Sequence, residues 1–326
     1  MNMVLEHETP VGAWFAGGER IAYDPEKAQI DEHASLRVFV RHEGDLSHAS
    51  TYMPGFPDGS IGWGRVQPHL PDSRTNQKLF VEYLGMGNSD KPKDVHYSTS
   101  ERADLVEALW RHYGVKSTTL IAFDFSSLVV LEILRRRLER TARGELNDGP
   151  SIRGVFIFNG GLFTDGHSHP WYTTPILRLP GGGIAPWLGK RSFFMFKQLA
   201  NAMWSREYNV PDHEVWELFE AMNHHDGLFF LNKGANFVAE HQAEGDRLDF
   251  AAIYAAYRNR FPFVVGGSTE DPFEKHQVTL AERRLGSQGL RIVRLPGGHL
   301  TTNEHPALLA DLVSTFEAGL QAGDGN

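Results

Sequence analysis

The stretch from Ser117 to Leu138 constrains the fold of this chain more than any other, because two different patterns meet in it. Residues up to Phe123 are β-branched or apolar, which is typical of a buried parallel strand. From Leu128 a long apolar run that turns basic near its end indicates a helix. A junction this short lifts one side chain clear of the sheet and points it at the helix N-terminus, where backbone N–H groups favour a negative charge. Asp124 is the residue best placed to occupy that position.

The junction reads Ala-Phe-Asp-Phe-Ser-Ser over residues 122–127 and resembles the nucleophile elbow of the α/β-hydrolases, in the branch where aspartate replaces serine. Epoxide hydrolases and haloalkane dehalogenases form this branch, and their elbow usually reads Gly-His-Asp-aromatic-Gly-Gly. Here small residues replace the glycines, and Phe123 replaces the histidine. The resemblance implies that Asp124 is a nucleophile. The alternative is that Asp124 only caps the helix that follows, a role for which Asp is favoured. A serine elbow centred on Ser126 would need a small residue at the position that Leu128 holds.

The composition excludes several classes of function. A net charge of −9 and a pI near 6.0, with no basic stripe, argue against a nucleic-acid partner. The absence of cysteine excludes disulfides, thiolate metal sites and a cysteine nucleophile. The first residues show no signal-peptide pattern, and no apolar run is long enough for membrane insertion. We therefore expect a soluble, cytoplasmic protein that is either a monomer or a homodimer.

Strand and helix patterns alternate along most of the chain, which predicts an α/β fold. Helical segments rich in Trp, Phe and Met interrupt the alternation, as an inserted lid does. We predict a core domain of residues 1–163 and 246–326 and a helical lid (cap) domain of residues 164–245. The expected architecture is the α/β-hydrolase fold, a mostly parallel eight-stranded sheet with the lid inserted after the sixth strand. The predicted strands are Gly12–Tyr23, Leu36–Arg41, Ala49–Met53, Leu79–Tyr83, Ser117–Phe123, Ile152–Phe158, Phe263–Gly267 and Arg291–Leu295.

The loop after the third predicted strand reads Pro-Gly-Phe-Pro over residues 54–57, where the same branch usually carries His-Gly-x-Pro and then a tryptophan. In that family the backbone N–H of the x residue is one half of the oxyanion hole, and the N–H after the nucleophile is the other. The resemblance implies that Phe56 and Phe125 take these places. Removing one such donor typically costs about 3 kcal/mol of transition-state stabilisation. Pro54 replaces the usual histidine, and Trp63 matches the tryptophan.

Two later strands end in residues that fit a catalytic triad. Asp271 follows the seventh predicted strand and precedes a proline, where the family places its triad acid, and Glu270 is the alternative. His299 follows two glycines after the last strand, and a Glu-x-Pro sequence comes soon after it. The order Asp124, Asp271, His299 is the α/β-hydrolase order of nucleophile, acid and base.

The similarity extends beyond these positions. His-Tyr-Ser at residues 96–98, Val-Glu-Ala-Leu at 106–109 and Asn-Gly-Gly-Leu-Phe at 159–163 are similar to the vertebrate mesoderm-specific transcript proteins, which are relatives of the epoxide hydrolases. The similarity runs from about Met53 to the C-terminus and is strongest before Phe163. It implies the fold and the Asp-nucleophile branch, but it supplies no substrate.

The candidates for the substrate pocket are Trp63, Asn159, Phe163, Tyr172, Trp204, Tyr208 and Phe237. Epoxide hydrolases use lid tyrosines as general acids that protonate the epoxide oxygen. The expected tyrosine falls on Phe237, which cannot donate a proton. The donor then has to be Tyr172, Tyr208 or a histidine such as His167. Haloalkane dehalogenases usually bind halide through a tryptophan after the nucleophile, and that position holds Phe125.

Four histidines stand in two pairs, His167 with His169 and His224 with His225. Neither pair has a carboxylate or thiolate partner at a recognisable spacing. We therefore expect no metal site, and the implied chemistry needs no cofactor.

The function that these patterns favour is epoxide hydrolase-like hydrolysis of a small apolar substrate. The resemblance implies that Asp124 forms an alkyl-enzyme ester and that water activated by His299 hydrolyses it. A haloalkane dehalogenase-like reaction and another Asp-nucleophile hydrolase are alternatives. So is a non-catalytic binding protein on a hydrolase scaffold, because fold does not imply function.

Overall fold

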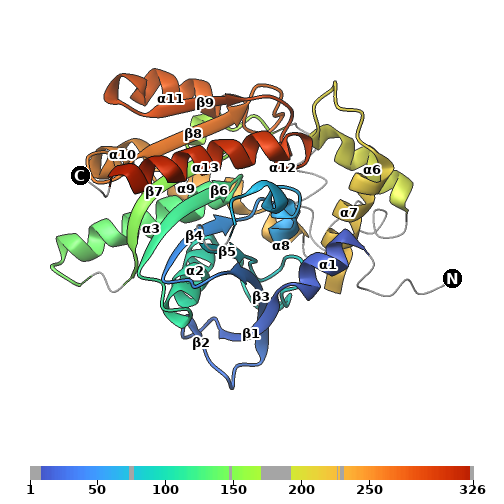
Figure 1. The fold of residues 1–326 in the computed structure, drawn as a ribbon, viewed down its shortest axis with the longest axis horizontal. Coiled ribbons are helices and arrows are strands. Elements are labelled where there is room, and N and C mark those ends of the chain that lie inside the picture. The colour runs from blue at the N-terminus through green and yellow to red at the C-terminus, as the bar shows by residue number, and fades with distance from the viewer. Residues whose placement is uncertain are drawn as a thin grey trace.

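The computed structural model describes residues 9–72, 77–146, 149–169, 192–225, 227 and 231–323 of the chain. They form one sheet with helices packed against both of its faces (Figure 1). Within these ranges, every helix is too short or too polar to cross a membrane.

The sheet has nine strands in the order β2-β1-β3-β5-β4-β6-β7-β8-β9. They are β1 (Glu19–Asp24), β2 (Gln29–Ile30), β3 (Leu36–Glu43), β4 (His48–Met53), β5 (Gln77–Val81), β6 (Ser117–Phe123), β7 (Ser151–Phe158), β8 (Phe263–Ser268) and β9 (Arg291–Leu295). Pairings that involve β1 or β3 are antiparallel, and all others are parallel. The predicted number of eight is wrong by one, because β2 pairs with β1 inside a segment that is too polar to indicate a strand.

The described helices connect these strands. They are α1 (Pro10–Ala16), α2 (Thr99–His112), α3 (Ser126–Ala142), α6 (Phe193–Ala200), α7 (Asp212–Asn223), α8 (Leu231–Gly234), α9 (Phe237–Glu244), α10 (Phe250–Tyr257), α11 (Gln277–Leu285), α12 (Thr301–Glu304) and α13 (Pro306–Gly323). Short 3₁₀ turns are η1 (Gly59–Trp63), η2 (Gln67–His69), η3 (Thr164–Gly166), η5 (Asn201–Met203) and η7 (Gly286–Gln288).

The first predicted strand, Gly12–Tyr23, is wrong in its first half, which is the helix α1. The helix begins because the Thr9 side chain accepts the N–H of Gly12, and Pro10 stands in the first turn, where its missing N–H costs nothing. The buried residues of α1 fall at positions i, i+3 and i+4, as on one face of a helix. The strand β1 starts only after this helix, at Glu19.

The central strands supply side chains to two cores, one on each face of the sheet. On β6, Leu120 and Ala122 join the core that contains α2 and α3, whereas Ile121 and Phe123 join the core that contains α13. Every residue of β6 is buried, as the sequence predicts for a central parallel strand. The turn after β6 therefore starts from a rigid base.

Between β7 and β8 the described chain is mainly helical; α6, α7, α8 and α9 fall within the predicted lid, and α10 follows it. We call residues 164–245 the inserted segment. Its helices α6 and α7 stand to one side of the sheet, next to α1 (Figure 1). Hydrogen bonds attach the segment to the core: the Thr99 N–H donates to the Glu240 carboxylate (2.9 Å), and the Ser205 N–H donates to the Glu304 carboxylate (2.8 Å).

Candidate active site

Asp124 stands on the turn between β6 and α3, where the sequence predicts the elbow. Its φ of 53° lies in the left-handed region, which typically costs a non-glycine residue about 1–3 kcal/mol. Two hydrogen bonds hold this conformation. The Asp124 N–H donates to the Phe158 carbonyl (3.0 Å), and the Ser127 N–H donates to the Asp124 carbonyl (2.9 Å). The neighbouring strand β7 thus helps to fix the turn.

The carboxylate of Asp124 is buried and faces backbone donors from two loops. The Phe56 N–H donates to Oδ2 (2.8 Å), and the Phe125 N–H also bonds to the carboxylate. Burial raises the pKa of Asp124, while the charge of His299 and these two hydrogen bonds lower it. The cap position of α3 belongs to Phe125, so a capping role alone does not account for the surroundings of Asp124.

His299 lies between the two carboxylates that the sequence singles out. Its Nδ1 is 2.9 Å from Oδ2 of Asp271, and its Nε2 is 3.7 Å from Oδ1 of Asp124. Burial lowers the pKa of His299. The charge and hydrogen bond of Asp271 and the charge of Asp124 raise it by more than that, so the pKa is raised to about 9. The two neighbouring carboxylates thus favour the protonated imidazole.

Asp271 is fixed by its own loop. Its Oδ1 accepts the N–H groups of Phe273 (2.8 Å) and Glu274 (3.2 Å), which leaves Oδ2 to the imidazole. The alternative acid, Glu270, is exposed and instead accepts the N–H of Arg206 (3.3 Å). Of the two predicted acids, Asp271 is therefore the one that contacts His299.

No family model matches the sequence. The human mesoderm-specific transcript homolog protein is 28% identical over 189 residues, which are 57% of this chain and 54% of that protein. The putative hydrolase LipZ of Mycobacterium tuberculosis is 27% identical over 278 residues, 84% of this chain and 90% of that protein. The chain thus spans about half the length of the first relative and most of the second.

Solved structures align with nearly the whole chain. The haloalkane dehalogenase DbeA from Bradyrhizobium elkani aligns with a TM-score of 0.69 at 17% identity, over 94% of this chain and 99% of its own. The epoxide hydrolase CorEH aligns with a TM-score of 0.62 at 16% identity, over 93% and 99%. The chain has the α/β-hydrolase fold. At these identities the solved structures establish the fold alone, and the predicted fold class is confirmed.

In this α/β-hydrolase fold, the predicted pocket residue Asn159 lies beneath the histidine loop. Its φ is 47°, and its amide is engaged at both ends. The side-chain nitrogen donates to the His299 carbonyl (2.8 Å), and the oxygen accepts the Ser268 N–H (2.7 Å). Asn159 thus joins the ends of β7 and β8 to the loop after β9. It positions His299 and has no free amide group to offer a substrate.

The predicted pocket residue Phe237 packs against Phe56 and Phe125, the two residues whose backbone N–H groups bond to the Asp124 carboxylate. Its ring centroid lies 5.8 Å from that of Phe56 and 5.5 Å from that of Phe125. The three rings pack against one another, next to the backbone N–H groups that bond to Asp124.

Two other predicted pocket residues, Trp63 and Phe163, have their ring contacts within the core. Trp63 is 1% exposed and packs edge-on against Tyr52 and Phe158 in the core. Phe163 packs against Phe250 and lies under the guanidinium of Arg284. The ring contacts of Trp63 are with core residues, whereas Phe163 also lines a cavity together with Leu162 and His241.

Trp204 lies closer to the triad. It is buried, and it follows Met203, whose carbonyl accepts the N–H of His299 (2.9 Å). The turn η5 therefore supports the histidine loop from the side of the inserted segment, and Trp204 lies next to that support.

Two of the three predicted proton donors are bonded elsewhere. The Tyr208 hydroxyl donates to Glu214 (2.8 Å), and this bond together with burial raises the pKa of Tyr208 to about 12. His167 contacts Glu274 through Nδ1 (2.8 Å) and His241 through Nε2 (2.9 Å). The third predicted donor, Tyr172, lies outside the described residues.

Sequence reasoning missed Asp58. Among the described residues neither of its carboxylate oxygens has a hydrogen-bond partner, and burial raises its pKa to about 7. The charge of Asp124 raises that pKa further, so the two carboxyl groups are close enough to interact. Its place in the sequence could have indicated it, because Asp58 directly follows the loop that contains Phe56.

Sequence reasoning also missed Glu274. Its carboxylate contacts both His167 and His169, for which the sequence shows no carboxylate partner at a recognisable spacing. The carboxylate comes from a position 105 residues after His169, which no local pattern reveals. Within the described part of the chain, these three residues are the group with ligand atoms close enough to hold a metal ion.

Proposed function

We propose that this chain is a hydrolase that converts a small apolar substrate, in the first place an epoxide, through an ester on Asp124. The observation that carries the proposal is the arrangement of Asp124. Its carboxylate stands on a strained turn, accepts the Phe56 N–H at 2.8 Å and lies 3.7 Å from the imidazole of His299. A residue that served packing alone would not need a base oriented by a second carboxylate.

In the first step, a carboxylate oxygen of Asp124 attacks an electrophilic carbon of the substrate. A new carbon–oxygen bond forms, the carbon–oxygen bond of the epoxide breaks, and the ring oxygen takes up a proton. The candidate donors are Tyr172, Tyr208 and a histidine such as His167; Tyr208 and His167 are bonded to carboxylates, so we propose Tyr172, which lies outside the described residues. Burial raises the pKa of Asp124, and the charge of His299 together with the N–H groups of Phe56 and Phe125 opposes that rise in favour of the carboxylate that attacks.

In the second step, His299 takes a proton from water, and the resulting hydroxide attacks the carbonyl carbon of the ester. The N–H groups of Phe56 and Phe125 stabilise the oxyanion that forms. Collapse of this intermediate releases the alcohol and restores the carboxylate of Asp124 with one oxygen from water. Asp271 holds the imidazole in place through Nδ1.

Ester formation on Asp124 also makes it easier for His299 to act as a base. In the unreacted protein, the charge of Asp124 helps to keep the proton on His299. Esterification removes that charge, so the pKa of His299 falls and the neutral imidazole becomes accessible nearer neutral pH. The order of the two steps thus follows from the electrostatics of one ion pair.

We further propose that the inserted segment, residues 164–245, acts as a lid whose Phe237 forms the apolar wall of the substrate pocket. The same wall favours a second candidate function, dehalogenation of a haloalkane. A halide leaves without a proton, and the rings of Phe56, Phe125 and Phe237 offer none. The similarity to solved structures of both enzyme classes is compatible with either reaction.

The test uses oxygen-18 water. The protein is incubated with a panel of apolar epoxides and haloalkanes, and the peptide that contains Asp124 is analysed by mass spectrometry. We expect labelled oxygen in the Asp124 carboxylate after repeated turnover, because water attacks the ester carbon. Ser126→Ala is the matched control and keeps both turnover and label. Turnover that leaves Asp124 unlabelled would overturn the ester mechanism.

A further inference from the structure

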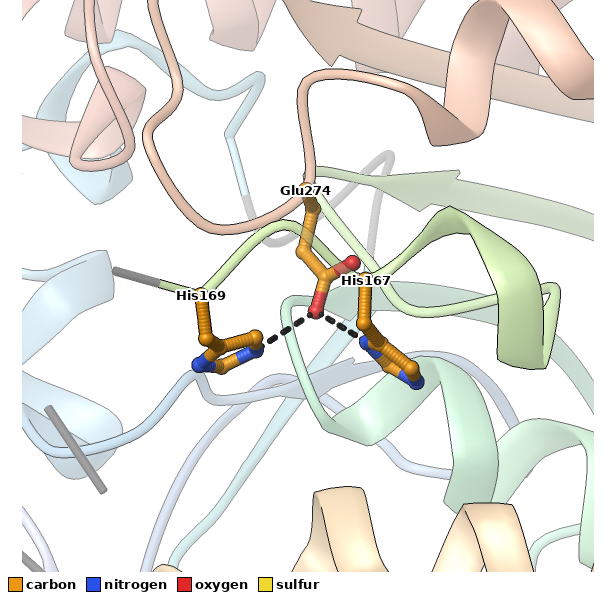
Figure 2. A group of neighbouring side chains, drawn as sticks. All are labelled: His167, His169 and Glu274. Carbon is orange, nitrogen blue, oxygen red and sulfur yellow. Dashed lines mark hydrogen bonds and ion pairs between the residues drawn. The ribbon is translucent and has the colours of Figure 1, made fainter. Parts of the chain in front are cut away.

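Two histidines at the start of the inserted segment meet one carboxylate from the core. Figure 2 shows the rings of His167 and His169 on either side of the Glu274 carboxylate. His167 Nδ1 lies 2.8 Å and His169 Nε2 3.1 Å from the same oxygen, Oε1. The ligand atoms of the three residues all lie within 4.8 Å of one another. Two imidazoles and a carboxylate are ligands that first-row divalent metals prefer.

The distances are close to those of a metal site. Tetrahedral zinc with bonds of about 2.0–2.2 Å to nitrogen and oxygen places neighbouring ligand atoms roughly 3.3–3.6 Å apart. The two contacts to Glu274, at 2.8 Å and 3.1 Å, are shorter, so a bound ion would move these atoms slightly apart. To complete the site, the His169 ring has to move toward His167, and its side chain is 22% exposed, which leaves it room to do so.

Neighbouring groups contact His167 and Glu274 in the way that outer hydrogen-bond partners orient metal ligands. Nε2 of His167 contacts Nδ1 of His241 (2.9 Å), so an Nε2–H donated there leaves the lone pair of Nδ1 for a cation. Oε2 of Glu274 accepts the side-chain N–H of Gln277 (3.0 Å). A Cβ at Gly161 would come 2.4 Å from the His167 ring, so the glycine makes room for it.

Charge also favours a cation at this point. The side chain of Glu274 is 1% exposed, and its carboxylate interacts electrostatically with Asp124 and His299. Asp271 lies three residues earlier in the same loop. The Glu274 carboxylate is thus a buried negative charge in the same loop as a second carboxylate, whose Oδ1 accepts the Glu274 N–H. A divalent cation would compensate it.

We propose that His167, His169 and Glu274 bind a first-row divalent cation, with zinc as the best fit. Three protein ligands leave one coordination position open. The cation would fasten the start of the inserted segment to the loop that carries Asp271. It would thereby fix the segment and the triad acid relative to each other. This site does not depend on the hydrolase mechanism, and its test needs no substrate.

The test is a metal titration of the full chain after removal of metal by a chelator. Co²⁺ serves as the spectroscopic probe and Zn²⁺ as the competitor. We expect one equivalent of Co²⁺ with the visible absorption of a low-coordinate site, displaced by one equivalent of Zn²⁺. Zinc should also raise the melting temperature, because a ligand of the folded state stabilises it.

Three variants locate the site. Glu274→Gln and His169→Ala should each weaken binding at least about tenfold, the smallest loss usual even for changes outside the ligand set. His225→Ala is the matched control: it removes a histidine of the other pair, which contacts Asn88, and should bind as wild type does. His169 is partly exposed, so its variant keeps the test valid if Glu274→Gln does not fold.

Two results would overturn the proposal. One is the absence of stoichiometric binding by wild-type protein that is folded by circular dichroism. The other is equal binding by wild type and a folded His169→Ala variant. Either result would leave the cluster as a hydrogen-bonded attachment of the inserted segment.

Discussion

The core and the inserted segment use their polar side chains in opposite ways. In the core, Asp124, Asp271 and His299 follow the ends of β6, β8 and β9 and converge on one point. In the inserted segment, the polar side chains named above bond to other protein groups. Tyr208 donates to Glu214 inside the segment, and His167 and His169 contact Glu274 of the core. The proposed triad therefore comes from sheet topology, whereas the described polar groups of the segment named here serve its attachment and Phe237 adds an aromatic ring beside Phe56 and Phe125.

The largest expected effect tests the core side of this comparison. Asp124→Asn removes the attacking carboxylate, and we expect turnover of any hydrolysed substrate to fall by about ten-thousandfold or more, as for loss of other nucleophiles. Steady-state kinetics on the substrate found by the oxygen-18 screen measures it. Ser126→Ala, which alters the same turn, should stay near wild type. Equal activity of Asp124→Asn and wild type would favour a different nucleophile.

The second prediction separates the two core steps. His299→Gln removes the base but leaves Asp124 and its donors, so the ester should form and persist. Turnover is expected to fall by about a thousandfold or more. Intact-protein mass spectrometry should show the added mass of the substrate, and the double variant with Asp124→Asn should not. A His299→Gln protein that never accumulates the adduct would contradict the assigned roles.

The third prediction tests whether the inserted segment contributes chemistry at all. Tyr172→Phe should lower epoxide turnover about a hundredfold, the lower end of the usual loss of a general acid. Turnover of a haloalkane should be unchanged, because halide needs no proton. Tyr208→Phe is the control for the loss of a tyrosine hydroxyl. If both tyrosine variants are fully active on epoxides, the donor lies elsewhere.

The fourth prediction concerns pH. His299 must be neutral to activate water, and its pKa is raised to about 9 in the unreacted protein. The rate of ester hydrolysis should therefore rise by about tenfold per pH unit and level off at an apparent pKa below 9, because esterification removes the Asp124 charge. Single-turnover kinetics from pH 5 to pH 10 measures it. A rate that falls with rising pH would contradict a base at this position.

The same shift affects stability with a defined sign. The folded-state pKa of His299 lies above its ordinary value of 6.5, so its contribution is complete below pH 6.5 and is lost as pH rises through about 9. The melting temperature of His299→Gln relative to wild type should reflect that loss, with the difference shrinking above pH 9.

The smallest expected effect tests the anchoring role. Tyr208→Phe removes the hydroxyl that donates to Glu214. We expect a loss of about 1 kcal/mol in the free energy of unfolding, the usual value for one hydrogen bond, and a change in turnover of less than about twofold. Denaturant unfolding and steady-state kinetics check the two parts. A large loss of activity with unchanged stability would move Tyr208 into the reaction.

The proposed triad was predictable because its residues stand where local patterns end and match motifs of the Asp-nucleophile branch. Asp124, Asp271 and His299 each follow an apolar run and Phe56 lies in a recognisable turn, but the resemblance was needed to single out these four. The nucleophile, acid and base are brought together by parallel strands, which place the carboxyl ends of neighbouring strands at one edge. Their chemical roles remain predictions that the experiments above test.

The rest depends on contacts distant in sequence. The Asn159 amide bonds to groups about 109 and 140 positions away, and the hydroxyl of Tyr208 has a partner six positions on that no helical pattern indicates. The partner of His169 comes from the loop after β8. Such pairs arise only when elements pack, so composition and spacing could not distinguish a substrate contact from an internal bond.

The amide of Asn159 has a consequence for how activity fails on heating. It links the ends of β7 and β8 with the backbone of the loop after β9. Partial opening of that edge of the sheet would break this link and release His299 from its place, even while the turn at Asp124 stayed intact. Thermal inactivation would then precede global melting, and the first cooperative unit to be lost would be the one that carries the base.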